Sequence, residues 1–242
     1  MRAVTGCAWV AAVLLCLGYS PPGRAASMEV DPVILHLPSQ RPVGVFRVRN
    51  GGHHPIEVQV DPYAWHEHDG HDVERPSRAL LVSPPIFDLP AGHTQLVRIG
   101  LRNPRRLNRE QSYRVHFSQL PMGSDTAYHA RLRLTIRMDV PVFVAPSGPV
   151  RRHVSWKAHR AGPHRVTVTA VNEGNVHVRY SEVAVSVAHG SALGARKGLF
   201  YVLPGRRRSW TFHSRKAISA STQLRVSART GTGKVHARMV AQ

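Results

Sequence analysis

Three histidines and two acidic residues stand close together between positions 66 and 71. The segment reads His66, Glu67, His68, Asp69, Gly70 and His71, so one glycine separates the last acid from the last histidine. Imidazole and carboxylate groups are ligands for Cu(II), Ni(II) or Zn(II). However, Asp69 and Gly70 form a turn signal at the end of an expected strand. We expect a solvated hairpin here and no metal site, with a periplasmic copper- or zinc-binding β-sandwich protein as the alternative function.

No other pattern in the chain calls for catalysis. The two cysteines, Cys7 and Cys16, both lie in the first 26 residues, so the rest of the chain has no thiol. Ser, His and Asp do not follow an order that is diagnostic of a hydrolase. Gly231 and Gly233 indicate a turn and not a phosphate-binding loop. The residues therefore predict a protein that is not an enzyme and needs no cofactor.

The most regular pattern is a long strand at residues 130–146. Leu132, Leu134, Ile136 and Met138 alternate with residues that are all charged except Thr135. Strict alternation predicts a strand with one apolar and one polar face. Pro141 and Pro146 disfavour an interior strand beyond this point. Such a strand is well suited to lend its edge and its apolar side chains to another chain.

The first 26 residues read as a secretory signal peptide. Arg2 precedes an apolar run at residues 8–17, and Ala25 and Ala26 offer small residues for cleavage. That run is short for a membrane span, although a retained anchor is the alternative. No later stretch is long and apolar enough for a transmembrane helix. We therefore expect an exported protein without disulfides and without membrane insertion after cleavage.

The chain is strongly basic, with 33 basic and 14 acidic residues and a formal net charge of +19. Such an excess can indicate a nucleic acid or anionic lipid as the partner. Here the excess is almost all arginine, and the arginines are spread through the chain. We therefore expect solvated strand faces and no nucleic-acid partner.

Short strands rich in Val, Leu and Ile recur every ten to twelve residues, with Pro, Gly, Asn and Asp between them. This pattern predicts an all-β protein built from β-sandwiches. A stiff connector at residues 145–149 divides the strands into two sets. We expect a signal peptide at residues 1–26, an immunoglobulin-like domain at 27–145 and a second one at 146–242.

Several motifs in this order resemble the periplasmic chaperones of fimbrial (pilus) subunits, which act in the chaperone–usher pathway. The motifs lie at residues 30–35, 50–52, 82–99, 110–114, 119–121, 141–144, 171–175 and 201–205. The N-terminal motifs resemble the archaic branch of the family. The resemblance implies two immunoglobulin-like domains in a boomerang arrangement, a periplasmic location, and pilin subunits and an outer-membrane usher as partners.

The resemblance also implies a mechanism, in which the chaperone completes a pilin that lacks its own last strand. The last strand of the first domain is donated to the pilin's apolar groove. By alignment, the donated side chains are those of Leu132, Leu134, Ile136 and Met138. The alternative is that they fill the chaperone's own core, as part of the row must do.

The family's usual cations for the pilin's terminal carboxylate are absent, because Ile34 and Pro141 occupy their positions. We expect Arg114 or Arg137 to serve instead. A hairpin turning near residues 124–125 would place these two arginines opposite each other. The resemblance further implies that Arg98 and Glu110 brace the two domains.

Overall fold

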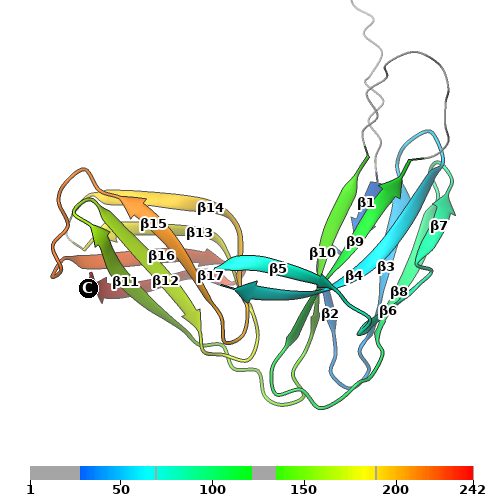
Figure 1. The fold of residues 1–242 in the computed structure, drawn as a ribbon, viewed down its shortest axis with the longest axis horizontal. Helices are drawn as coiled ribbons and strands as arrows, with labels where there is room; N and C mark the ends of the chain where they lie inside the picture. Colours follow the sequence, from blue (N-terminus) through cyan, green and yellow to red (C-terminus); the bar gives the residue numbers. More distant parts are fainter. Residues whose placement is uncertain (1–27, 69, 122–134, 189, 242) are drawn as a thin grey trace, which may run out of the picture.

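The computed structural model describes residues 28–68, 70–121, 135–188 and 190–241. Every regular element in these ranges is a β-strand. The strands form two sandwich domains that are set at an angle to each other (Figure 1). The predicted all-β, two-domain architecture is therefore confirmed. The expected signal peptide, Leu132 and Leu134 lie outside the described residues.

The first domain packs a four-stranded sheet against a six-stranded sheet. The first sheet has the order β1 (Met28–Asp31), β3 (Val43–Asn50), β8 (Thr94–Leu101) and β6 (Leu80–Ser83). The second has the order β2 (Leu35–Leu37), β10 (Arg137–Val144), β9 (Gln111–Leu120), β4 (Ile56–His68) and β5 (His71–Pro76), and β7 (Ile86–Leu89) also pairs with β4. Alternate side chains such as Phe46, Val58 and Phe117 are fully buried between the sheets.

The first two strands, β1 and β2, follow closely in the chain but belong to different sheets. β1 pairs with β3, whereas β2 runs parallel to β10. Pro32 has no N–H group to donate to a ladder, so the strand ends there and the chain crosses to the other sheet. This crossing places β2 beside only the last three residues of β10.

The second domain also consists of two sheets. One has the order β11 (Val154–Gly162), β12 (Arg165–Asn172) and β15 (Arg207–His213). The other has the order β14 (Ala192–Val202), β13 (Val178–Val187), β16 (Gln223–Thr230) and β17 (Gly233–Val240). Tyr180, Phe212 and Leu224 are buried between them. The described residues contain no helix that is long and apolar enough to cross a membrane.

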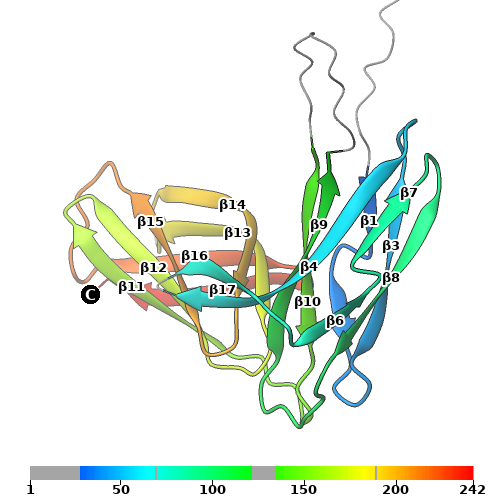
Figure 2. The same ribbon diagram turned by 45° about the vertical axis from the view of Figure 1, so that its right-hand side comes forward.

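The hairpin formed by β4 and β5 reaches from the first domain to the second, as both views show (Figures 1 and 2). Near its base, Trp65 of β4 and Phe143 of β10 pack with Tyr201 and Leu203 of the second domain. All four side chains are buried. The two domains thus share a small apolar core of their own.

Candidate functional site

Strand β10 changes from buried to partly exposed along its apolar row. Val140, Val142 and Val144 are 4%, 0% and 0% exposed and belong to the first domain's core. Ile136 and Met138 continue the same row, but they are only partly buried against that core. The valines therefore hold the domain together, whereas Ile136 and Met138 retain apolar surface outside it.

Strand β10 also has a backbone edge that is only partly paired. On one side it pairs with β9 along its whole length, Arg137–Val144. On the other side, within the described residues, β2 pairs only with Val142, Phe143 and Val144. The Gln119 N–H donates to the Ile136 carbonyl. In an antiparallel ladder the backbone groups of alternate residues point to the same neighbour, so the N–H and C=O groups of the even-numbered residues of β10 point to β9. The N–H groups of Arg137 and Asp139 consequently point to the open edge.

Arg114 lies in the middle of the six-stranded sheet, on the face opposite the sandwich core. Its guanidinium carbon is 4.0 Å from the centroid of the Trp65 ring, a cation–π contact. Its Nη1 donates to Glu74, and its Nη2 donates to Asp72 Oδ2 at 2.7 Å. Only 19% of the Arg114 side chain is exposed. Two carboxylates from β5 thus neutralise a largely buried arginine.

The same face carries further ionic contacts toward the start of β10. His116 Nε2 lies 2.7 Å from Glu74 Oε2 and 3.6 Å from Asp139 Oδ1, although without hydrogen-bond geometry. Arg137 donates to both carboxylate oxygens of Asp139. Its side chain is 60% exposed.

The two candidate arginines do not face each other as expected. Arg114 is opposite Pro141, and Arg137 is opposite Ser118. Each residue of β9 is therefore paired with a residue of β10 that lies four positions later than a turn near residues 124–125 would give. As a result, Arg114 lies across from Pro141, one of the two positions where the family resemblance places a cation, and Arg137 lies four residues before Pro141.

The interdomain brace involves Glu110, but not with the expected partner. Glu110 Oε1 accepts hydrogen bonds from the His177 backbone N–H at 3.0 Å and from His177 Nδ1 at 2.8 Å. Arg98 lies on the exposed face of β8, in the other sheet. Among the described residues, no ion pair joins Arg98 to Glu110. The expected Arg98–Glu110 pair is thus replaced by a contact from Glu110 to His177 of the second domain.

A second buried carboxylate, that of Glu67, also joins the domains and was not anticipated. Its Oε2 accepts the Leu203 backbone N–H at 2.9 Å, and its Oε1 lies 3.7 Å from Arg208 Nη1. Burial raises the pKa of Glu67 to about 7, despite the opposing effects of that hydrogen bond and of Arg208. The alternation of Trp65 and Glu67 on one face of β4 was the available signal.

Strand β4 separates the members of the histidine cluster. His66 and His68 are exposed on one face of the strand, whereas Glu67, on the other face, is buried against the second domain. In the part of the chain that the structure describes, no three His, Cys, Asp or Glu side chains are grouped to hold a metal ion. Asp69 lies outside that part.

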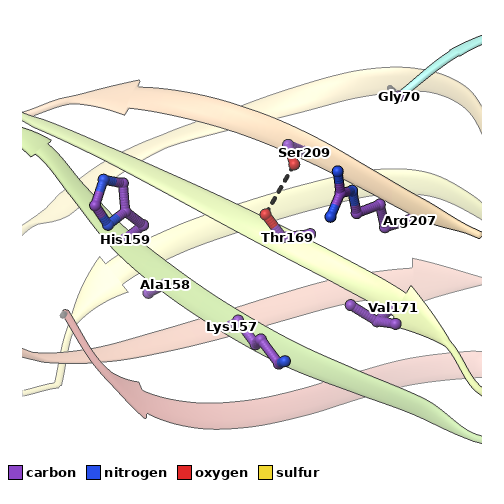
Figure 3. Close-up of a pocket in the computed structure, with 8 residues that line it drawn as sticks. All are labelled: Gly70, Lys157, Ala158, His159, Thr169, Val171, Arg207 and Ser209. Atoms are coloured by element: carbon purple, nitrogen blue, oxygen red, sulfur yellow. Dashed lines mark hydrogen bonds between the residues drawn. The ribbon is translucent and has the colours of Figure 1, made fainter. Parts of the chain in front are cut away.

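A cavity of about 440 Å³ lies on the three-stranded sheet of the second domain (Figure 3). Lys157, Thr169 and Ser209 line it, and the two hydroxyl groups are hydrogen bonded at 2.8 Å. Gly70, at the tip of the β4–β5 hairpin, lines it from the first domain. The cavity therefore marks where the hairpin tip meets the second domain, away from the open edge of β10.

Comparison with known proteins gives a family for the first domain. Residues 27–149 match the family "Pili and flagellar-assembly chaperone, PapD N-terminal domain". The chain is also 25% identical over 133 residues to the uncharacterized fimbrial chaperone YhcA of Escherichia coli strain K12. That match covers 55% of this chain and 56% of YhcA, so the chain spans about half the length of this relative.

Solved structures with a similar fold cover most of the chain. One is the CsuC–CsuE chaperone–tip adhesion subunit complex from archaic chaperone–usher Csu pili of Acinetobacter baumannii, with a TM-score of 0.66 and 17% identity over 90% of this chain and 100% of that chain. Another is the complex of the Salmonella enterica SafA pilin with the SafB chaperone, with a TM-score of 0.61 and 18% identity over 88% and 96%. These likenesses establish the two-domain fold. Because the family match covers just over half of the sequence, the chain belongs to the pili and flagellar-assembly chaperone family.

Proposed function

We propose that this protein is a periplasmic chaperone that binds a pilin subunit by donating strand β10, and that it delivers the subunit to an outer-membrane usher. The observation that carries the proposal is the combination of two features in one short segment. Residues 137–141 of β10 have an edge that is unpaired within the described residues, and Ile136 and Met138 retain apolar surface beside it.

An open strand edge can accept another strand by backbone hydrogen bonding, and alternate side chains can then fill the partner's groove. Burying a Leu, Ile or Met side chain stabilises a complex by roughly 1.5–3 kcal/mol. Leu132, Leu134, Ile136 and Met138 together would supply four such side chains. The gradient of burial along β10 supports a division between the valines of the core and these donated residues.

We assign the anchoring of the subunit's terminal carboxylate to Arg114. Arginine can meet a carboxylate with two parallel hydrogen bonds. Arg114 faces Pro141 across the β9–β10 ladder, where the resemblance places the usual cation, and Trp65 supports its guanidinium. Arg137 is the second candidate, but its side chain is more exposed and it lies at the start of β10, four residues before Pro141.

The proposal is tested by capture of a pilin subunit that lacks its own last strand, co-expressed from the same organism. The native chain should purify with it as a one-to-one complex, without nucleotide or metal. Ile136→Arg should abolish capture, because a charge forced into an apolar groove costs several kcal/mol. Thr135→Arg is the matched control, because Thr135 is exposed on the opposite face.

The thermal melt of each free variant separates donation from a core role. Loss of capture by Ile136→Arg with an unchanged melt supports donation. A collapsed melt would instead place Ile136 in the chaperone's own core. A subunit that stays soluble and assembles equally well without this chain would contradict the chaperone function.

A further inference from the structure

We propose that Asp72 and Glu74 of β5 keep the Arg114 site closed in the free protein, and that an incoming carboxylate has to displace them. This inference rests on the proposed role of Arg114 as the subunit anchor. It adds a competition between the chain's own carboxylates and the subunit's carboxylate at one guanidinium.

Both terminal nitrogens of Arg114 already donate to carboxylates of the chain itself. Nη1 donates to Glu74 and Nη2 donates to Asp72, while the Trp65 ring covers one face of the guanidinium. A carboxylate that binds bidentately needs two neighbouring N–H groups of the fork. Every such pair includes at least one terminal nitrogen, and both terminal nitrogens already donate to an internal carboxylate. A ligand carboxylate therefore competes with Asp72 and Glu74 for these nitrogens and for the charge of the guanidinium.

The strand that carries these carboxylates lies at the edge of its sheet. Within the described ranges, its one ladder partner is β4. Its displacement therefore breaks no second ladder. The Asp72 and Glu74 side chains are 27% and 22% exposed, so water already reaches them.

Each carboxylate also has another cationic or titratable partner that would retain it. Asp72 Oδ1 lies 3.3 Å from Arg208 Nη1 of the second domain. Glu74 Oε2 lies 2.7 Å from His116 Nε2. Displacement from Arg114 thus leaves neither carboxylate isolated, which lowers the cost of exchange. Because Asp72 contacts Arg114 and Arg208 together, the exchange would also alter a contact between the domains.

The test uses the full mature chain and acetate as the probe, at constant ionic strength with chloride as the matched salt. Binding is followed through the side-chain ¹⁵N resonance of Arg114. We expect Asp72→Asn/Glu74→Gln to bind acetate at least tenfold more tightly than the native chain, and each single variant to give an intermediate affinity. Asp139→Asn is the matched control, because it removes a carboxylate from the same face without a contact to Arg114.

Two results would overturn the inference. One is an acetate affinity of the double variant equal to that of the native chain. The other is tighter binding that persists after Arg114→Ala is added, which would place the acetate elsewhere. If the native chain captures no subunit, the proposed function fails, but the acetate titration still decides whether Asp72 and Glu74 close the site.

Discussion

At the scale of single residues, Glu67 links stability to pH. Burial raises its pKa to about 7, whereas a Glu in an unfolded chain titrates near 4.5. The folded protein therefore holds this proton more tightly than the unfolded chain does. The contribution of Glu67 to the free energy of unfolding is most favourable below pH 4.5 and declines as the pH rises toward 7, by at most about 3 kcal/mol.

Glu67→Gln should remove this decline, because glutamine keeps an oxygen for the Leu203 N–H and does not ionise. We expect urea unfolding to show a smaller loss of stability between pH 5 and pH 8 in the variant than in the native chain. Glu29→Gln is the control, because that side chain is 58% exposed. An unchanged pH dependence in Glu67→Gln would mean that the carboxylate is solvated or fully compensated by Arg208.

Arg114 carries the second prediction at this scale. Arg114→Ala should weaken subunit capture by about 2–4 kcal/mol, because it leaves the subunit's carboxylate without its partner. Arg114→Lys should restore only part of the affinity, since a lysine cannot reproduce the fork. Affinity is compared with that of Arg137→Ala. If Arg137→Ala loses capture and Arg114→Ala does not, the anchor is Arg137.

At the scale of elements, alternation in the sequence predicted most strands, since each buries one face against its own domain. The apolar row from Ile136 to Val144 is one example. Strand β5 was indicated only by the turn signal at Asp69 and Gly70, which predicted a hairpin there. Its segment, His71–Pro76, has charged residues on both sides of Val73 and no apolar row, because its inward face contacts Arg114 and not a core.

The candidate site was only partly predictable, because some of its features depend on local sequence patterns and others on contacts between distant residues. The donated row depends on local alternation, which a sequence displays. The register of β9 against β10 depends on the length of the connection between them, and the pairing of Arg114 with Pro141 followed from that register. The contacts from Glu110 to His177 and from Glu67 to Leu203 join residues 67 and 136 positions apart, which no local pattern reveals.

At the scale of the whole molecule, the two domains are joined by more than the connector at residues 145–149. Glu67 and Glu110 of the first domain each accept a backbone N–H of the second, in addition to the shared apolar core around Trp65 and Phe143. Buried polar groups whose hydrogen bonds are all made favour one arrangement of the elements that carry them. The angle between the domains in Figure 1 is therefore set by specific contacts.

The central claim is that a subunit adds a strand to the open edge of β10, and amide hydrogen exchange tests it most directly. The N–H groups of Arg137 and Asp139 point to that edge, whereas those of Met138 and Val140 face β9. Subunit binding should slow exchange at Arg137 and Asp139 by at least a hundredfold, because both gain backbone partners. A one-to-one complex in which these two amides exchange as fast as in the free protein would contradict donation of β10.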